Sequence, residues 1–599
     1  MPMHSASPVA EPNCAVCAEE ALRPEILLRP EILQRPEFPP GSEISLQPEI
    51  SLEPEVLPHP EAAARRMRWL HLALLAVAAI FFALHFVHLR ADFPNNSPWM
   101  DWSKYTDEGW YGDAAIRHYQ LGHWNVPGDF NSAAALPVWP MVETVLFHVT
   151  GVSLVAARAL TVTVFGLILL CCCQLMRRAL SSNRCSAIAV LLLAVSPFCF
   201  VFMRLAILEP MLILLALLSL LVATKAGETD SLPWAALLGL LLTALALTKT
   251  TGVFLFPAIF WMLWASAGFR WRTFWRSATL ACVVGTIIWG SYYTLLVRPH
   301  YLVDYRYLFS ANAYTGITRD TFWTVIGDTI LDTAWIGKTL AILSGMAVLG
   351  AAVWLSVQRT RCTPLVGALL LWIFGYAAFL AYHDNLQPRY YLVSAIPLTM
   401  LTALCFEAIL IGMEALYTRR FLLWTVRTIA LATGGALVFT AAHGAWMTVG
   451  FVRHPEYIWV STAEQIRTVI DRERAANPAH SRLLLSISGS EISLITGVPS
   501  ICDDFGTMEL PDRVARYKPG WFATWNDVED DKMEALTPAY RLVRMATIPA
   551  FDDPERNLLI LYRLDSAGAS VHGRRRLRTV PRRLRTPIGE QPTQEQLLH

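Results

Sequence analysis

The chain has 599 residues, of which 54% are hydrophobic, 11% aromatic and only 16% charged, and its mean hydropathy is +0.40. A soluble domain usually carries about 25% charged residues, so this composition excludes an ordinary soluble protein and indicates many membrane spans. The formal net charge of +1 at pH 7 gives no reason to expect nucleic acid or another polyanion as a partner.

Residues 1–64 contain a degenerate repeat, "RPEILLRPEILQRPEF" followed by "SEISLQPEISLEPEV". Proline every few residues removes backbone donors and interrupts both helix and sheet. We therefore predict a disordered Pro/Glu-rich tail. Because this stretch is acidic and lacks an apolar core, it does not read as a cleavable signal peptide.

Eleven apolar segments follow, and each can form a spanning helix of about 20 residues when its flanking residues are included. They are 69–89, 152–176, 186–203, 206–224, 233–248, 250–267, 276–297, 336–357, 364–382, 390–414 and 424–450. The stretch 137–150, "PVWPMVETVLFHVT", contains two prolines and Glu143 and is shorter than a span. We predict an interfacial helix there.

Basic residues between the segments set the predicted orientation. Arginines precede the first segment, and alternation from there puts every clustered basic loop on the side of the N-terminus. These residues are Arg65, Arg66, Arg68, Arg177, Arg178, Arg184, Lys225, Arg270, Arg272, Arg276, Arg359, Arg361, Arg419 and Arg420. We therefore predict a cytoplasmic N-terminus, a transmembrane unit over 65–452 and an extracytoplasmic C-terminus. Counting 137–150 as a span would invert nearly all of these loops.

The pattern changes after the last apolar segment. Helix-like "STAEQIRTVIDRERAA" is followed by strand-like "RLLLSIS" and "NLLILYRL", which predicts a small α/β domain over 453–565 on the outer face. The arginine-rich end, 566–599, is predicted to be a disordered basic tail, with contact to anionic headgroups or an acidic polymer as the alternative. The predicted fold class is an all-α polytopic membrane protein with about 11 spans and a small C-terminal α/β domain.

Charged and aromatic side chains gather in the loops predicted to face outward. The first loop, 90–151, contains adjacent carboxylates in "SKYTDEGWYGD", and later loops contain "FMRLAILEP", "LTKTTG" and "YHDNLQPRYYLVSAIP". The residues singled out from these loops are Asp107, Glu108, Tyr111, His123, Arg204, Glu209, Lys249, Gln387, Arg389 and Tyr390. Charges near hydrocarbon are costly to keep, so this group is the candidate functional site.

Each charge also has an ordinary structural explanation. Asp107 can cap a helix that begins at the next residue. Arg204 and Glu209 can form an ion pair across a tight turn. Lys249 can extend its aliphatic side chain so that its ammonium group reaches the membrane interface. Arg389, followed by two tyrosines, can anchor the chain at the headgroups. Their joint occurrence on one predicted face favours a shared function over these separate explanations.

The segment "YTDEGWYGDAAIRHYQLGHW" in the first outer loop resembles the Asp-Glu motif of GT-C glycosyltransferases, in the branch of protein O-mannosyltransferases and aminoarabinose transferases. "RLAILEP", "ALALTKTTGVFLFPA" and "QPRYYLVSAIP" are similar to later motifs of that branch, in the same order, over roughly 69–450. Many members carry a Lys-Pro-Pro element where this chain reads "DFNSAAALPVWP". That lysine is missing here, which leaves Lys249, Arg204 or Arg389 to contact a phosphate.

The resemblance implies a GT-C membrane glycosyltransferase that passes a sugar from a polyprenyl-phosphate carrier, with inversion, to an acceptor on the outer face of the cytoplasmic membrane. It implies Asp107 as the catalytic base, with Glu108 orienting it or sharing a divalent cation, Mg or Mn, with it. The implied contacts of the donor phosphate are Lys249, Arg204 and Arg389. The supporting residues are Glu209, Tyr111, His123, Tyr390 and Gln387. The acceptor stays open between a protein, lipid A and another glycan.

Two other classes of protein stay open as well. An O-antigen ligase or polymerase has related chemistry, and a secondary transporter also combines many spans with a few charges. A transporter is expected to show internal repeats and interrupted helices near the membrane midplane, and the two halves of this sequence show no similarity. The chain also lacks the G-x-G-x-x-G fingerprint of a dinucleotide site, which agrees with a lipid-linked donor.

Overall fold

The computed structural model describes residues 60–94, 97–99, 101–179, 183–311, 318–330, 336–357, 363–383, 387–415, 420–526, 528–550 and 557–567. The tails predicted over 1–64 and 566–599 lie almost entirely outside these residues, so their disorder stays a prediction. The described residues from Glu61 onward belong to one compact unit.

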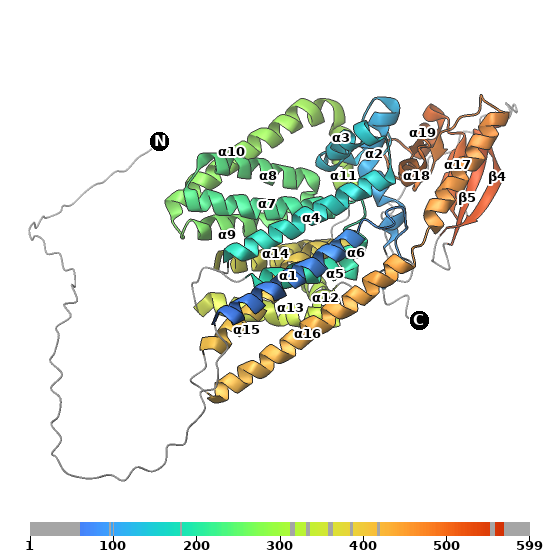
Figure 1. Ribbon diagram of the computed structural model, residues 1–599. Coiled ribbons are helices and arrows are strands. Elements are labelled where there is room, and N and C mark those ends of the chain that lie inside the picture. The colour runs from blue at the N-terminus through green and yellow to red at the C-terminus, as the bar shows by residue number, and fades with distance from the viewer. Residues whose placement is uncertain are drawn as a thin grey trace, which may run out of the picture. The chain divides into compact units, whose positions relative to one another are not determined.

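The described chain is helical up to Arg453 (Figure 1). After α1 (Pro60–Leu84), the first predicted outer loop contains η1 (Trp102–Tyr105), α2 (Asp107–Leu121), η2 (Ser132–Ala134) and α3 (Val138–Thr150). The helices that follow are α4 (Leu154–Ala179), α5 (Arg184–Val195), α6 (Pro197–Phe202), α7 (Leu208–Thr229), α8 (Leu232–Thr248), η3 (Thr250–Leu255), α9 (Phe256–Ser266), α10 (Trp271–Tyr292), η4 (Tyr293–Tyr301), α11 (Leu302–Ala311), α12 (Arg319–Ile330), α13 (Lys338–Val357), α14 (Thr363–Tyr382), η5 (Pro388–Tyr391), α15 (Leu392–Ala415) and α16 (Arg420–Arg453).

Among the described residues, seven helical runs are long and apolar enough to cross a membrane. They are Leu154–Ala179, Leu208–Thr229, Trp271–Ser310, Lys338–Ser356, Thr363–Tyr382, Pro388–Met413 and Leu423–Ala476. The shorter apolar helices are Trp69–Leu84, Arg184–Val195, Leu232–Thr248 and Thr250–Ser266. Each of these runs overlaps one predicted apolar segment. The protein is a multi-pass membrane protein, whereas eleven crossings and the predicted orientation stay predictions.

The predicted segment 186–203 is divided into two helices rather than one. Helix α5 ends at Val195, and the hydroxyl of Ser196 accepts the backbone N–H of Cys199 at 3.2 Å. Pro197 occupies the first position of α6, where its missing N–H costs nothing. Serine followed by proline is a strong start signal for a helix, and it explains the break inside an apolar run.

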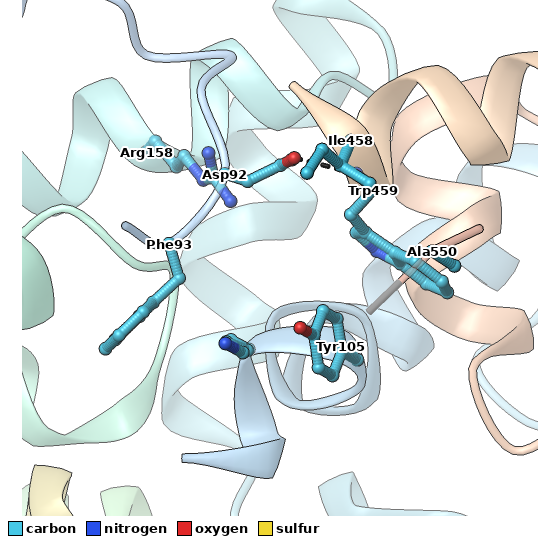
Figure 2. A pocket seen from close by; sticks show the side chains of 8 residues that line it. Asp92, Phe93, Tyr105, Arg158, Ile458, Trp459 and Ala550 are labelled. Carbon is cyan, nitrogen blue, oxygen red and sulfur yellow. Dashed lines mark hydrogen bonds between the residues drawn. The ribbon is translucent and has the colours of Figure 1, made fainter. Parts of the chain in front are cut away.

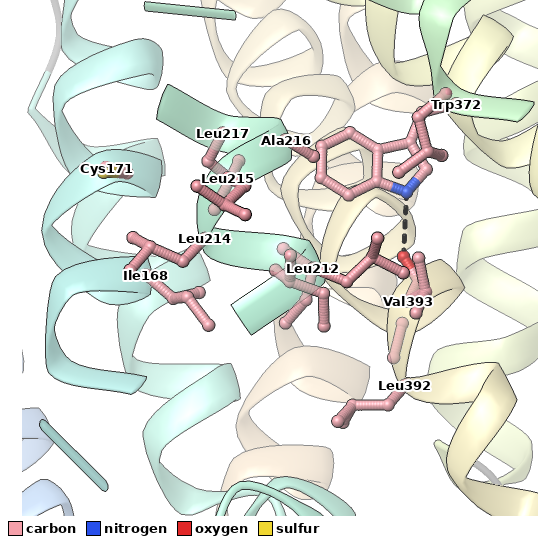
Figure 3. Close-up of a cluster of buried hydrophobic side chains, with 14 of the residues drawn as sticks. Ile168, Cys171, Leu212, Leu214, Leu215, Ala216, Leu217, Trp372, Leu392 and Val393 are labelled. Atoms are coloured by element: carbon pink, nitrogen blue, oxygen red, sulfur yellow. Dashed lines mark hydrogen bonds between the residues drawn. The ribbon is translucent and has the colours of Figure 1, made fainter. Parts of the chain in front are cut away.

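Helix α7 lies at the centre of the transmembrane core and packs against α4, α8 and α9. Figure 3 shows Leu212 and Leu214 of α7 in one buried cluster with Ile168 of α4. In the same cluster, Trp372 of α14 donates its indole N–H to the carbonyl of Val393 in α15 at 3.0 Å. A helix that is apolar on all sides packs inside a bundle. The packing of α7 against its neighbours therefore fixes the position of its N-terminus.

The C-terminal part confirms the predicted sheet region. Its elements are α17 (Ile458–Ala476), β1 (Leu484–Leu485), α18 (Gly489–Thr496), β2 (Ser500–Ile501), α19 (Leu510–Tyr517), β3 (Trp521–Trp525), α20 (Asp530–Leu536), β4 (Tyr540–Pro549) and β5 (Leu558–Ser566). The strand order is β2-β1-β3-β5-β4, with β1 parallel to β2 and β3, and β5 antiparallel to β3 and β4. We refer to residues 458–566 as the outer domain, after the face on which the sequence predicts them to lie.

The two faces of this sheet are covered by different apolar clusters. Trp521 and Leu559 face the cluster that includes α17, whereas Phe522 and Leu564 face the other. Successive residues of a strand point to opposite faces, which explains how adjacent Trp521 and Phe522 serve both clusters. The strand predicted from "RLLLSIS" is much shorter than expected, since only Leu484–Leu485 pairs as a strand.

The predicted fourth outer loop connects the first loop with the outer domain. Asp304 of α11 accepts hydrogen bonds from Asn131 at 3.2 Å and from Thr507 at 3.3 Å. The hydroxyl of Tyr307 accepts the backbone N–H of Gly506 at 3.2 Å. Three segments far apart in the sequence therefore meet beside α2.

Candidate active site

Arg389 is the hub of a buried group of charges. Its guanidinium contacts three carboxylates, with Nη1 2.8 Å from Asp101 Oδ1, Nη2 2.8 Å from Asp107 Oδ2 and Nε 3.8 Å from Glu209 Oε1. Lys249 Nζ donates to the same oxygen of Glu209 at 2.5 Å. We refer to these five residues as the Arg389 cluster. The structure thus brings Asp107, Glu209, Lys249 and Arg389 together, as the sequence predicts.

The residues of the Arg389 cluster sit at the ends of helices. Asp107 and Glu209 lie in the first turns of α2 and α7, where the helix dipole favours negative charge. Lys249 directly follows α8, and a helix C-terminus favours a cation. Arg389 lies in η5, which leads into α15. Backbone electrostatics therefore supports the charges of Asp107, Glu209 and Lys249. Arg389 precedes the N-terminus of α15, where the dipole disfavours a cation, so its charge depends on its carboxylate partners.

Burial sets the proton affinity of Asp107. Asp107 is only 3% exposed. The Arg389 cluster to which it belongs contains three carboxylates and only two cations. Burial raises the pKa of Asp107 to about 6, and Asp101 and Glu209 add to this increase, although the Arg389 guanidinium opposes it. A carboxylate whose pKa is closer to neutrality is a better general base than an ordinary aspartate.

Tyr390 packs against both cations of the Arg389 cluster. Its ring centroid lies 4.1 Å from Lys249 Nζ and 4.8 Å from the Arg389 guanidinium carbon, within the range of cation–π interactions. The backbone N–H of Tyr390 donates to the carbonyl of Gln387 at 3.0 Å, and Gln387 is itself buried. These two predicted supporting residues therefore belong to the turn that presents Arg389.

Tyr111 lies one helical turn after Asp107 in α2. Burial raises the pKa of Tyr111 well above its ordinary value, and the neighbouring Asp107 carboxylate adds to the increase. The phenol is consequently neutral at physiological pH and available as a hydrogen-bond donor beside the Arg389 cluster.

Glu108 belongs to a different network from Asp107. Its carboxylate accepts Arg158 Nε at 2.8 Å and the backbone N–H of Ala206 at 2.8 Å, and it also pairs with Arg158 Nη2. Arg158 Nη1 in turn donates to the carbonyls of Leu89 and Ala91. This network fastens α2 to α4, to the turn before α7 and to the chain after α1.

Arg204 and His123 have their contacts elsewhere. Arg204 Nη2 donates to the carbonyls of Val87 at 2.8 Å and His88 at 2.7 Å. These two hydrogen bonds hold the backbone that follows α1. His123 is exposed, with Nδ1 2.8 Å from the carbonyl oxygen of Asn125. These contacts are structural, so the roles predicted for Arg204 at the donor phosphate and for His123 as a supporting residue gain no support from them.

The same geometry bears on a metal. Among the described residues, no group of three or more His, Cys, Asp and Glu side chains is placed to hold a metal ion. Glu108 forms an ion pair with Arg158, whereas Asp107 forms one with Arg389. The predicted divalent cation shared by Asp107 and Glu108 does not fit this arrangement.

Two members of these networks were not predicted as site residues. Asp101 is one of several charged residues in the first predicted outer loop, 90–151, and Arg158 is predicted only as part of an apolar segment. Arg158 lies inside the apolar segment 152–176, where an arginine is costly without a buried partner, and that cost is the signal that could have identified it.

A small cavity lies where the outer domain meets the chain after α1 (Figure 2). Asp92 caps the start of α17 there, accepting the backbone N–H groups of Trp459 at 2.7 Å and Val460 at 3.2 Å. Burial raises the pKa of Asp92 to about 6. Arg158 also lines this cavity, so the contact between the outer domain and the chain after α1 lies next to the network of Glu108.

Two solved structures share the fold of this chain. ArnT from Cupriavidus metallidurans in the apo state matches with a TM-score of 0.55 and 16% sequence identity, covering 84% of this chain and 98% of that chain. ArnT from the same organism bound to undecaprenyl phosphate matches with a TM-score of 0.50 and 15% identity, covering 82% of this chain and 98% of that chain. At these identities the likeness concerns the fold, and the chain has the GT-C type of fold predicted from its motifs.

A family model adds a more particular similarity. Residues 134–289 match the family described as dolichyl-phosphate-mannose-protein mannosyltransferase. This range contains Glu209 and Lys249 of the Arg389 cluster, together with Arg158. No curated protein sequence matches the chain. The resemblance to the mannosyltransferase family is confirmed over this range, and the likeness to ArnT is one of fold.

Proposed function

We propose that the protein is a membrane glycosyltransferase that transfers a sugar from a polyprenyl-phosphate donor to an acceptor hydroxyl, with inversion at the anomeric carbon. The observation that carries this proposal is the Arg389 cluster, in which a buried carboxylate of raised pKa, Asp107, lies beside two cations. The fold shared with ArnT and the match to the mannosyltransferase family point to the same chemistry.

Asp107 is the general base in this proposal. It takes the proton of the acceptor hydroxyl while the hydroxyl oxygen forms a bond to the anomeric carbon. The bond between that carbon and the donor phosphate oxygen breaks in the same step. A single displacement inverts the configuration and requires no second, nucleophilic carboxylate.

Lys249 and Arg389 stabilise the departing polyprenyl phosphate. Negative charge grows on the phosphate as the glycosidic bond breaks, and two buried cations at fixed positions favour that charge more than water would. Glu209 holds both cations before the donor binds, because its Oε1 contacts Lys249 at 2.5 Å and Arg389 at 3.8 Å. Each such group contributes about 3 kcal/mol to lowering a barrier of this kind.

The proposed reaction takes place on the extracytoplasmic face of the cytoplasmic membrane. Helix α4 supports this orientation, because Arg158 near its start lies with the residues of α2, whereas Arg177 and Arg178 lie in its last turn. Basic residues collect on the cytoplasmic side, so the α2 end of α4 faces the other compartment. Undecaprenyl phosphate, bound by the ArnT structure, is a carrier lipid of the proposed donor class.

A direct assay tests this function. The purified full-length protein is mixed with a radiolabelled polyprenyl-phosphate sugar and envelope extract as the source of acceptor, and release of the polyprenyl phosphate is followed. The proposal expects release that depends on the acceptor and is lost in Asp107→Asn. Glu473→Gln is the matched control, since Glu473 pairs with Arg563 within the outer domain. Mass analysis of glycans and glycoproteins from a deletion strain, beside one carrying Asp107→Asn, identifies the acceptor class.

A further inference from the structure

Helix α2 begins without a cap of its own. The side chain of Thr106, which precedes the helix, makes no capping hydrogen bond and instead donates to Asp107 Oδ1 at 3.1 Å. The first N–H groups of any helix lack intrahelical partners and need acceptors from elsewhere. The N–H of Gly109 finds one in Glu491 Oε2 at 2.6 Å, 382 residues further along the chain. A carboxyl group of the outer domain therefore caps the helix that carries Asp107.

The packing around this cap is unusually close. A Cβ atom at Gly109 would lie 2.1 Å from the backbone nitrogen of Glu491 and 2.2 Å from the carbonyl carbon of Ser490, so only glycine fits. Ser490 also donates its hydroxyl to Asp113 of α2 at 3.0 Å, and Trp110 donates its indole N–H to the carbonyl of Ile487 at 3.0 Å. The segment 487–491 therefore packs closely against the first two turns of α2.

Burial disfavours the charged form of the capping carboxyl. Glu491 is fully buried, and burial raises its pKa well above the ordinary value, with the nearby Glu108 carboxylate adding to the increase. Its second oxygen, Oε1, has no hydrogen-bond partner among the described residues. Glutamine has the same shape and keeps an acceptor oxygen, so it can accept the N–H of Gly109 without a charge.

We propose that Glu491 is a positioning residue for Asp107: by accepting the N–H of Gly109 it fixes the first turn of α2, which makes the outer domain part of the catalytic unit. Asp107 is two residues from Gly109 in that turn, so a shift of the turn moves its carboxylate relative to Arg389. Displacement of a reacting group by about 1 Å can cost a hundredfold in rate. The catalytic part of this inference rests on the proposed function.

The test compares variants of Glu491 in the full-length protein. Glu491→Ala removes the acceptor and Glu491→Asp shortens it, so both are expected to lower kcat at least about tenfold with an unchanged KM for the lipid donor. Glu491→Gln is expected to keep kcat within about threefold of the wild type. Glu473→Ala is the matched control within the outer domain, because its partner is Arg563. Wild-type kcat in Glu491→Ala, or an equal loss in Glu491→Gln, overturns the proposal; if Glu491→Ala does not fold, Glu491→Asp carries the comparison.

Hydrogen exchange of the peptide 107–121 separates this inference from the proposed function. Exchange is expected to be at least about fivefold faster in Glu491→Ala and Glu491→Asp than in the wild type, and unchanged in Glu491→Gln and Glu473→Ala. Equal exchange in all of the variants overturns the cap even if the protein is a glycosyltransferase. A wild-type protein that transfers no sugar overturns the proposed function, while the exchange comparison still decides whether Glu491 holds α2.

Discussion

Asp107 and Glu108 are adjacent in the sequence, but Asp107 pairs with Arg389 whereas Glu108 pairs with Arg158. Consecutive residues of an α-helix point about 100° apart, so one carboxylate faces the Arg389 cluster and the other faces α4. The acidic pair therefore divides its work. Asp107 lies in the Arg389 cluster, where we propose that it is the general base, and Glu108 fastens α2 to α4.

Asp107→Asn is expected to lower the transfer rate at least about a hundredfold, because the amide cannot take the acceptor proton. The melting temperature is expected to stay near the wild-type value, since asparagine has the same shape and Arg389 keeps Asp101 as a partner. Initial rates of polyprenyl phosphate release and thermal unfolding in detergent measure the two effects. Near-normal transfer by this variant would contradict the assignment of the base.

Glu108→Gln is expected to act mainly on stability. Removing one partner of a buried ion pair leaves the Arg158 guanidinium uncompensated, which costs about 3–5 kcal/mol. The double variant Glu108→Gln with Arg158→Met is expected to recover part of this loss. Thermal unfolding of the wild type and of the two variants checks the prediction. A Glu108→Gln protein with wild-type stability and no activity would instead give Glu108 a chemical role.

Transfer is expected to depend on pH through Asp107. A base works in its ionised form, and the pKa of this carboxyl is raised to about 6, so kcat/KM should be constant above that pH. Below pH 6 protonation removes the base, and kcat/KM should fall about tenfold for each pH unit. A pH profile in which kcat/KM stays constant down to pH 5 would exclude Asp107 as the titrating base.

Lys249→Met separates the structural role of this lysine from its role at the donor phosphate. The substitution removes the closest cation from Glu209, so both stability and activity are expected to fall. Adding Glu209→Gln removes the uncompensated charge and should restore the melting temperature, whereas transfer should stay at least about tenfold below wild type. Recovery of full transfer in the double variant would show that Lys249 does not act on the donor.

Cysteine labelling tests the predicted orientation. His123 in the first outer loop and Arg178 at the end of α4 are both exposed, so cysteine at either position can react. A membrane-impermeant maleimide should label His123→Cys in intact cells and Arg178→Cys only after permeabilisation, relative to the unsubstituted protein. Labelling of both cysteines in intact cells would contradict the predicted orientation.

The transmembrane helices follow from the sequence because hydropathy is a local property that each segment carries in full. Four of the five members of the Arg389 cluster are also visible in the sequence, since residues such as Lys249 and Arg389 stand out as isolated charges beside apolar runs, whereas Asp101 does not. The pairing of Glu108 with Arg158 is not, because 50 residues and a helix crossing separate them. The two-residue strand β1 and the close packing on Gly109 also depend on contacts that no local pattern reports.

The contact between Gly109 and Glu491 has a consequence for how the protein is made. At about 5–20 residues per second, the ribosome needs roughly 20–80 s to add the 382 residues that separate them. During that interval α2 has left the ribosome without its cap, and the outer domain is still incomplete. The first turn of α2 can therefore reach its final form only late in synthesis, after Glu491 has been added.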